Sequence, residues 1–172
     1  AGASVVNATK PLDLLLKGGH VLDPANGIDA ARDVGIVGGN IVQVAAGIPA
    51  SKAADVVDVS GHYVTPGLVD IHTHVHTFLP TAESYVEGVN ADAHLLASGV
   101  TTTVDAGTVG WRDFPDLKTR CIDRANVRIL AFLNIADGGM VHMASEQDPH
   151  AMHPGIVAAV AEEFSDIIVG IK

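Results

Sequence analysis

The chain has 172 residues, of which 48% are apolar and 17% charged, and its 20 acidic against 10 basic side chains give a formal net charge of −10. This composition excludes an intrinsically disordered chain, which needs low hydrophobicity. The acidic balance argues against nucleic acid and anionic membranes as partners, because both bind basic patches. No apolar run reaches the 18 residues that a membrane-spanning helix needs. The single Cys121 fits a cytoplasmic location, with a periplasmic or secreted mature form as the alternative.

The first third of the chain contains short apolar runs that are separated by glycine-rich turns. Two runs flank Gly18-Gly19, where the sequence allows either a hairpin or a bulge. Two more flank the turn at residues 38–40, and a further strand is expected around Val56 and Val57. These patterns predict a small antiparallel β unit.

After Pro66-Gly67, strand-length apolar runs alternate with stretches of helical period. The expected strands are 68–71, 101–104, 127–135 and 167–171. The expected helices contain Val86 to Leu96, Phe114 to Ala125 and Ile156 to Phe164. Their expected starts are marked by a capping box of Ser84 and Glu87, by Asp113 as an N-cap and by Pro154 near the first turn. This order predicts a parallel sheet, which could be a doubly wound open sheet or half of a closed eight-stranded barrel.

The most informative segment is the apolar run that ends in His72-Thr73-His74. Alternation along a strand places His72 and His74 on one face, at the carboxyl end where parallel α/β proteins hold their ligands. Imidazole nitrogens at that spacing can converge on zinc. His76 continues the face, where it could contact substrate or support the site.

The segment 66–74 resembles the signature of the amidohydrolase superfamily, which carries two histidines at the end of barrel strand 1. The resemblance extends through residues 55–65, 99–107 and 130–135. It is greatest to the amidohydrolase/deacetylase metallohydrolases, relatives of dihydroorotase and D-aminoacylase. The resemblance implies two domains. Residues 1–65 would be the amino-terminal part of a β-sandwich, and residues 66–172 the first half of a (β/α)8 barrel, which needs roughly 250 residues to close.

The resemblance also implies a metal centre. His72 and His74 would bind one of one or two divalent ions, most simply zinc, and Lys172 would bridge them as a lysine carboxylated by carbon dioxide. The general-base Asp and the remaining histidine ligands would lie beyond residue 172. Asp105 and Asn134, at the ends of the second and third barrel strands, could support the site or face the substrate.

The expected activity is hydrolysis of an amide or ester bond by metal-bound hydroxide, with deacylation of a small N-acyl or O-acetyl carboxylic acid as the first substrate proposal. The alternatives are a cyclic amide hydrolase and an inactive metal-binding fragment that needs a second polypeptide. Dihydroorotase-like sites carry an Arg two residues after the second histidine, where this chain has His76, and this argues against dihydroorotate. A homo-oligomer is expected, and activity requires the other half of the barrel.

Overall fold

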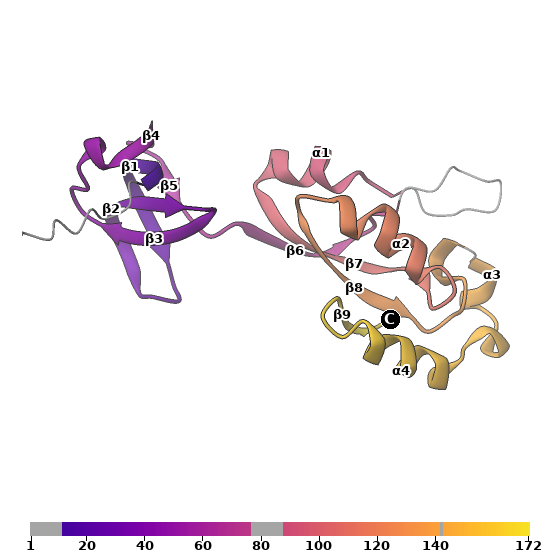
Figure 1. The fold of residues 1–172 in the computed structure, drawn as a ribbon. Coiled ribbons are helices and arrows are strands. Elements are labelled where there is room, and N and C mark those ends of the chain that lie inside the picture. The colour runs from indigo at the N-terminus through magenta and orange to yellow at the C-terminus, as the bar shows by residue number, and fades with distance from the viewer. Residues whose placement is uncertain (1–11, 77–87, 142) are drawn as a thin grey trace, which may run out of the picture. The chain divides into compact units, whose positions relative to one another are not determined.

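The structure is a computed structural model that describes residues 12–76, 88–141 and 143–172. The chain forms two compact units, Ala1–Pro66 and Gly67–Lys172, called here the first and the second unit (Figure 1). The sequence analysis put the domain boundary one residue earlier, after residue 65.

The first unit is a five-stranded mixed sheet. Its strands are β1 (Leu12–Asp23), β2 (Ile28–Val37), β3 (Asn40–Ala45), β4 (Ala53–Asp58) and β5 (Tyr63–Val64), in the order β3-β2-β1-β4, with β5 also paired to β1. β1, β2 and β3 are antiparallel neighbours, but β4 and β5 run parallel to β1. The prediction of an antiparallel unit was therefore wrong for β4 and β5. The connection from β3 through the short helix η1 (Ala50–Lys52) reaches the far side of β1 instead of turning back beside β3.

Two glycine positions explain how this sheet bends and turns. The register of β1 against β2 shifts between Leu16 and Gly19, and Gly18 has a φ of 81°. Of the two readings of Gly18-Gly19, the bulge is therefore confirmed and the hairpin is wrong. The hairpin at Gly38-Gly39 is confirmed, because both residues have positive φ angles and join β2 to β3.

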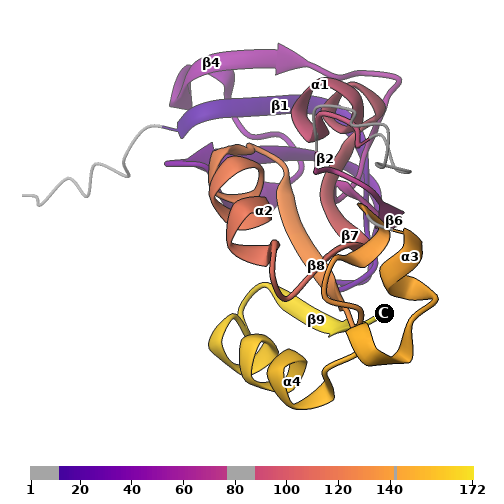
Figure 2. The same cartoon turned by 90° about the vertical axis from the view of Figure 1, so that its right-hand side faces the viewer.

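The second unit is a parallel four-stranded sheet in the order β6-β7-β8-β9, which confirms the predicted α/β class. The strands are β6 (Leu68–Thr73), β7 (Val100–Gly110), β8 (Arg128–Asn134) and β9 (Ile168–Ile171). Figure 2 shows β7, β8 and β9 side by side. The connections contain α1 (Ala91–Leu95), η2 (Leu96–Ser98), α2 (Phe114–Arg120), η3 (Ile122–Arg124), η4 (Gly139–Val141), α3 (Met143–Glu146), η5 (Pro149–Ala151) and α4 (Pro154–Glu163).

The starts of α1 and α4 follow from local sequence signals. The predicted capping box of Ser84 and Glu87 lies outside the described residues. The described helix α1 begins later than expected, because the side chain of Asn90 accepts a hydrogen bond from the Ala93 amide at 2.9 Å and caps it there. α4 begins at Pro154 as predicted.

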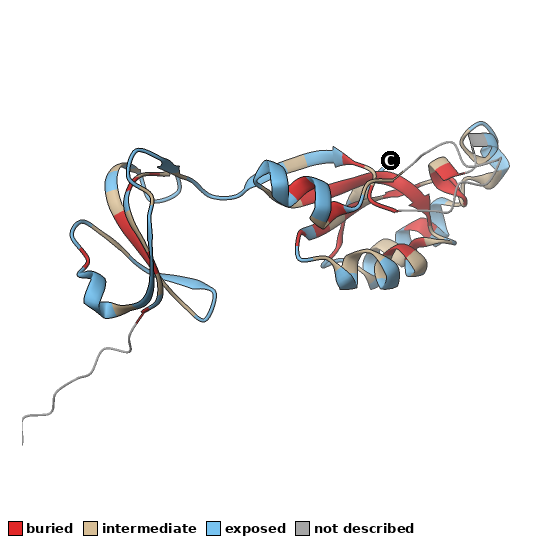
Figure 3. Cartoon of the chain, turned by 90° about the horizontal axis from the view of Figure 1, so that it is seen from above, coloured by how far each residue is buried: buried red, intermediate tan, exposed pale blue. Residues whose placement is uncertain are grey.

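The core of the second unit lies between its sheet and its helices. Phe114 on α2 is fully buried, and its ring lies 5.1 Å from that of Phe164. The buried apolar cluster also draws on β7, β8, β9 and α4, through residues that include Val109, Ile129, Leu133, Val157 and Ile168. Figure 3 shows this burial concentrated along the central strands. Among the described residues, no helix is long and apolar enough to cross a membrane.

Candidate functional site

The two predicted metal-binding histidines lie where β6 ends. His72 is exposed on the strand and His74 follows it half-buried, with 5.7 Å between the ring centroids. Thr73 between them points to the other face, where its hydroxyl donates to the Val104 carbonyl at 3.1 Å. The alternation expected of a strand therefore places both imidazoles on one face, as the sequence predicted.

His74 is oriented by a chain of hydrogen bonds from β7. The Thr108 hydroxyl donates to the buried Asp105 carboxylate at 2.8 Å, and it lies 2.7 Å from His74 Nδ1. Because the hydroxyl proton is used on Asp105, the Thr108 oxygen accepts from Nδ1–H. This fixes the tautomer of His74 and leaves the Nε2 lone pair for a metal ion.

Asp105 is the anchor of that chain. Its carboxylate is fully buried and also accepts hydrogen bonds from the Val75 amide at 2.9 Å and the Thr108 amide at 2.8 Å. The structure thus places Asp105 behind His74, where a supporting residue is expected. Burial lowers the pKa of His74 below its ordinary value; the charge of Asp105 opposes this, and those of Lys172 and His72 add to it. A neutral imidazole, the form that binds metals, is favoured.

Lys172 follows β9 and is held in the sheet by its backbone. Its amide donates to the Leu133 carbonyl at 2.9 Å, and its carbonyl accepts from the Ile135 amide at 3.0 Å. Its Nζ donates to Met140 Sδ at 2.9 Å. Lys172 also lines a recess of about 260 Å³, together with Asn134, Ile135, Ala136, Glu146, Gln147 and Met152.

Asn134 joins three elements beside this recess. It is 2% exposed, and its Nδ2 donates to the Gly107 carbonyl at 3.0 Å and to Glu146 Oε1 at 2.7 Å. Its Oδ1 accepts from the Ala136 amide at 3.0 Å. Of the two roles expected of Asn134, this burial fits support of the site.

His76 has different surroundings from His72 and His74. It is fully buried, and its Nε2 lies 2.9 Å from the Asp116 carboxylate on α2. Burial lowers its pKa, and the hydrogen bond to Asp116 opposes that shift. Contact with substrate, one of the two roles expected of His76, does not fit these surroundings.

Sequence reasoning missed Glu146 and the role of Thr108. Glu146 lies on α3, and its charge raises the pKa of His74. No sequence pattern predicts that residue 146 acts on residue 74. The position of Thr108, three residues after Asp105, could have predicted its role, because a hydroxyl there can donate a hydrogen bond to the carboxylate.

The donors present fit part of a metal centre. Within residues 12–76, 88–141 and 143–172, no three His, Cys, Asp or Glu side chains gather into a group that could hold an ion. The chain therefore offers two imidazoles whose donor chemistry suits zinc, and Lys172 adds an oxygen ligand only if it is carboxylated.

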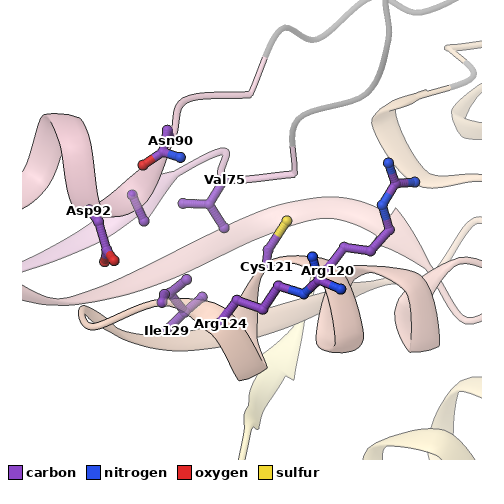
Figure 4. Close-up of a pocket in the computed structure, with 9 residues that line it drawn as sticks. Val75, Asn90, Asp92, Arg120, Cys121, Arg124 and Ile129 are labelled. Atoms are coloured by element: carbon purple, nitrogen blue, oxygen red, sulfur yellow. The ribbon is translucent and has the colours of Figure 1, made fainter.

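A second, smaller cavity of about 100 Å³ lies beside α1, α2 and β8. Figure 4 shows the Cys121 sulfur directed into it, with Val75 and Arg120 nearby. It is lined by none of the predicted site residues, so it is separate from the histidine pair.

Known proteins resemble this chain in both sequence and structure. No family model matches the chain. An adenine deaminase 2 from Rhizobium etli is 37% identical over 94 residues, which are 55% of this chain and 15% of that protein. A dihydroorotase from Citrifermentans bemidjiense is 40% identical over 93 residues, which are 54% of this chain and 21% of that protein. A crystal structure of an adenine deaminase superposes with a TM-score of 0.73 at 29% identity, over 93% of this chain and 40% of that structure.

The chain belongs to the amidohydrolase superfamily. This confirms the predicted membership and identifies β6 to β9 as the first strands of the superfamily's barrel. The match spans only 15% of the length of the adenine deaminase and 21% of that of the dihydroorotase. An L-hydantoinase from Arthrobacter aurescens, at 18% identity and a TM-score of 0.65, shares the fold.

Proposed function

We propose that the protein carrying this chain is a metal-dependent hydrolase that cleaves an amide or ester bond, with a C–N bond as the first expectation. The observation that carries the proposal is the pair of His72 and His74 at the carboxyl end of β6, with His74 Nδ1 held by Thr108. Hydrogen bonds that fix a tautomer and present Nε2 are typical of metal-binding histidines.

A bound divalent ion supplies two things to such a reaction, a water molecule of lowered pKa and a polarised carbonyl. His72 and His74 would hold the ion, and zinc suits their nitrogen donors. Thr108 and Asp105 would keep His74 in place. The general base and the remaining ligands are expected on strands outside this chain.

Lys172 would contribute after carboxylation. In that step the neutral Nζ adds to carbon dioxide, an N–C bond forms, one C–O π bond becomes the carboxylate, and one proton passes to water. The anionic oxygens would then be available as ligands for one or two divalent ions. The position of Lys172 after β9, with its charge close enough to affect His74, supports this role.

Two substrate classes follow. Deacylation of an N-acyl or O-acetyl carboxylic acid is the first, by resemblance. Cyclic amide hydrolysis is the second, and the dihydroorotases among the relatives favour it. Buried His76, bonded to Asp116, cannot form the bidentate pair with a substrate carboxylate that an Arg provides in dihydroorotases, so dihydroorotate itself is not expected.

The test uses the full-length protein. After extensive dialysis, metal analysis is expected to find at least one divalent ion per chain. The double variant His72→Ala/His74→Ala is expected to lose this ion. His94→Ala, on α1, is the matched control and keeps the ion. The substrates to assay are an N-acetyl amino acid, an O-acetyl acid, hydantoin, dihydroorotate and adenine. Less than one tightly bound ion per chain would overturn the enzyme proposal and leave the inactive fragment.

A further inference from the structure

Gly107, on β7, lies against the side chain of Lys172. A Cβ at position 107 would lie 2.6 Å from Lys172 Cδ and 2.8 Å from Lys172 Cβ, closer than real Cβ atoms approach. Because Lys172 Cβ is attached directly to the backbone of the strand end, swinging the far end of the lysine cannot relieve both contacts. Gly107 also has a φ of 78°, which side chains other than glycine rarely tolerate. Glycine therefore provides the space that the lysine stem occupies.

Asn134 fixes the backbone at that glycine. Its Nδ2 donates to the Gly107 carbonyl and to Glu146, and its Oδ1 accepts from the Ala136 amide. With both Nδ2 hydrogens and the oxygen in use, the orientation of the amide is determined by its partners. Asn134 is 2% exposed, and its bonds to Gly107 and Ala136 are buried.

The two ends of Lys172 are held as well. Its backbone bonds to Leu133 and Ile135 of the neighbouring chain segment, and its Nζ donates to Met140 Sδ. Met140 belongs to η4, which packs so closely on β7 that a Cβ on Gly139 would meet a β7 carbonyl oxygen at 2.6 Å. The lysine is thus restrained at its backbone and along its stem, and its exposed Nζ has Met140 as a partner.

We propose that Gly107 and Asn134 are positioning residues that hold the stem of Lys172 in place for the metal site to which His72 and His74 contribute. The inference rests on the proposed function, in which carboxylated Lys172 binds metal. A free lysine side chain loses rotamer entropy when it is ordered. Packing that orders the stem before metal binds removes this entropy loss from the binding step.

The test compares two alanine substitutions at glycines with the same backbone geometry. Gly99 also has a φ of 78°, but a Cβ there would meet only Leu68 Cδ1, at 3.9 Å. In the full-length protein, Gly107→Ala is expected to abolish the carbamate signal in ¹³C NMR after exposure to ¹³C-bicarbonate. It is also expected to weaken zinc binding about 10- to 100-fold. Gly99→Ala should keep both, while sharing the loss of thermal stability that the backbone strain causes.

Asn134→Asp is the second variant, because it keeps the side-chain volume and removes the Nδ2 donors without adding an atom beside Lys172. It is expected to weaken zinc binding and reduce the carbamate signal. A folded Gly107→Ala protein with the carbamate and zinc affinity of the wild type overturns the inference. If Gly107→Ala does not fold, an unchanged Asn134→Asp protein overturns it.

Two further outcomes are distinct. If neither variant folds while Gly99→Ala does, both residues serve the fold itself and the inference is overturned. A wild-type protein without carbamate overturns instead the role of Lys172 in the proposed function, on which the inference rests.

Discussion

Each unit buries polar side chains, but the hydrogen bonds of these side chains end in different places. In the first unit, Asp33 is 4% exposed, and its carboxylate accepts from the Gly18 and Ile48 amides at 2.8 Å each and from Lys17 Nζ at 3.3 Å. Its partners are two amides and one lysine that itself donates to the Ile48 carbonyl. The network holds loops to strands, and its half-exposed lysine, Lys17, turns back to a backbone carbonyl of the same network.

In the second unit, the corresponding networks lead to half-buried side chains of the candidate site. Asp105 acts through Thr108 on half-buried His74, and Asn134 holds half-buried Glu146. Each buried carboxylate accepts from two backbone amides and one side chain. In the second unit that side chain, Thr108, also bonds His74 and so orients a candidate metal ligand. The second unit therefore carries the candidate chemistry.

The largest expected effect is on the core of the second unit. Phe114→Ala should lower the free energy of unfolding by about 3–5 kcal/mol, because the fully buried ring leaves a cavity. Hydrogen exchange of the full-length protein should show faster exchange in peptides from α2 and β8. Leu15→Ala, in the core of the first unit, is the counterpart and should accelerate exchange in β1. Unchanged exchange in α2 after Phe114→Ala would contradict the packing described here.

Thr108→Val separates orientation from stability. The valine keeps the shape and leaves His74 Nδ1 without its acceptor, so zinc binding should weaken about 10- to 100-fold. Thr103→Val is the matched control on β7, because Thr103 is equally buried but bonds to Thr73 and Asp70. Isothermal titration with zinc should distinguish the two. Equal zinc affinities would refute the role given to Thr108.

Asp33→Asn tests the first unit and its pH dependence. Burial raises the pKa of Asp33, but hydrogen bonds from Gly18 and Ile48 and the Lys17 ammonium outweigh it, and the folded-state pKa lies below its ordinary value. The stabilisation is therefore present above the unfolded-state pKa of about 4 and lost as the pH falls through the folded-state pKa.

The substitution should cost about 1–3 kcal/mol at neutral pH and leave zinc binding unchanged. Unfolding followed between pH 2 and pH 7 should show a smaller loss at low pH than in the wild type. Asp55→Asn, exposed on β4, is the control and should follow the wild type.

The smallest effect is expected for Lys118→Ala. Its Nζ lies 2.7 Å from the Asp123 carboxylate, but the pair is partly exposed, so the loss should be less than about 1 kcal/mol and fall further with added salt. Denaturation at low and high salt measures it. A loss of stability as large as that of Asp33→Asn would contradict the expectation that exposed polar pairs stabilise the fold less than buried ones.

The sequence predicted the elements that depend on local pattern. The four apolar runs became β6 to β9, alternation placed His72 and His74 on one face, and Pro154 marked the start of α4. It did not predict that β4 pairs parallel to β1, because the direction of pairing depends on the path of a connection rather than on the strand's residues. The start of α1 was misplaced because Asn90 competes as a cap.

The amino-acid sequence by itself determined the parallel sheet and the strand end that carries two imidazoles, since hydrophobic period and residue spacing are local properties. Its motifs also resembled those of the superfamily. Only the tertiary structure decided which imidazole is held by Thr108, that His76 is buried against Asp116, and that Asn134 reaches both Gly107 and Glu146. These contacts join residues 12 to 40 positions apart. They exist because parallel strands bring distant carboxyl ends to one edge of a sheet.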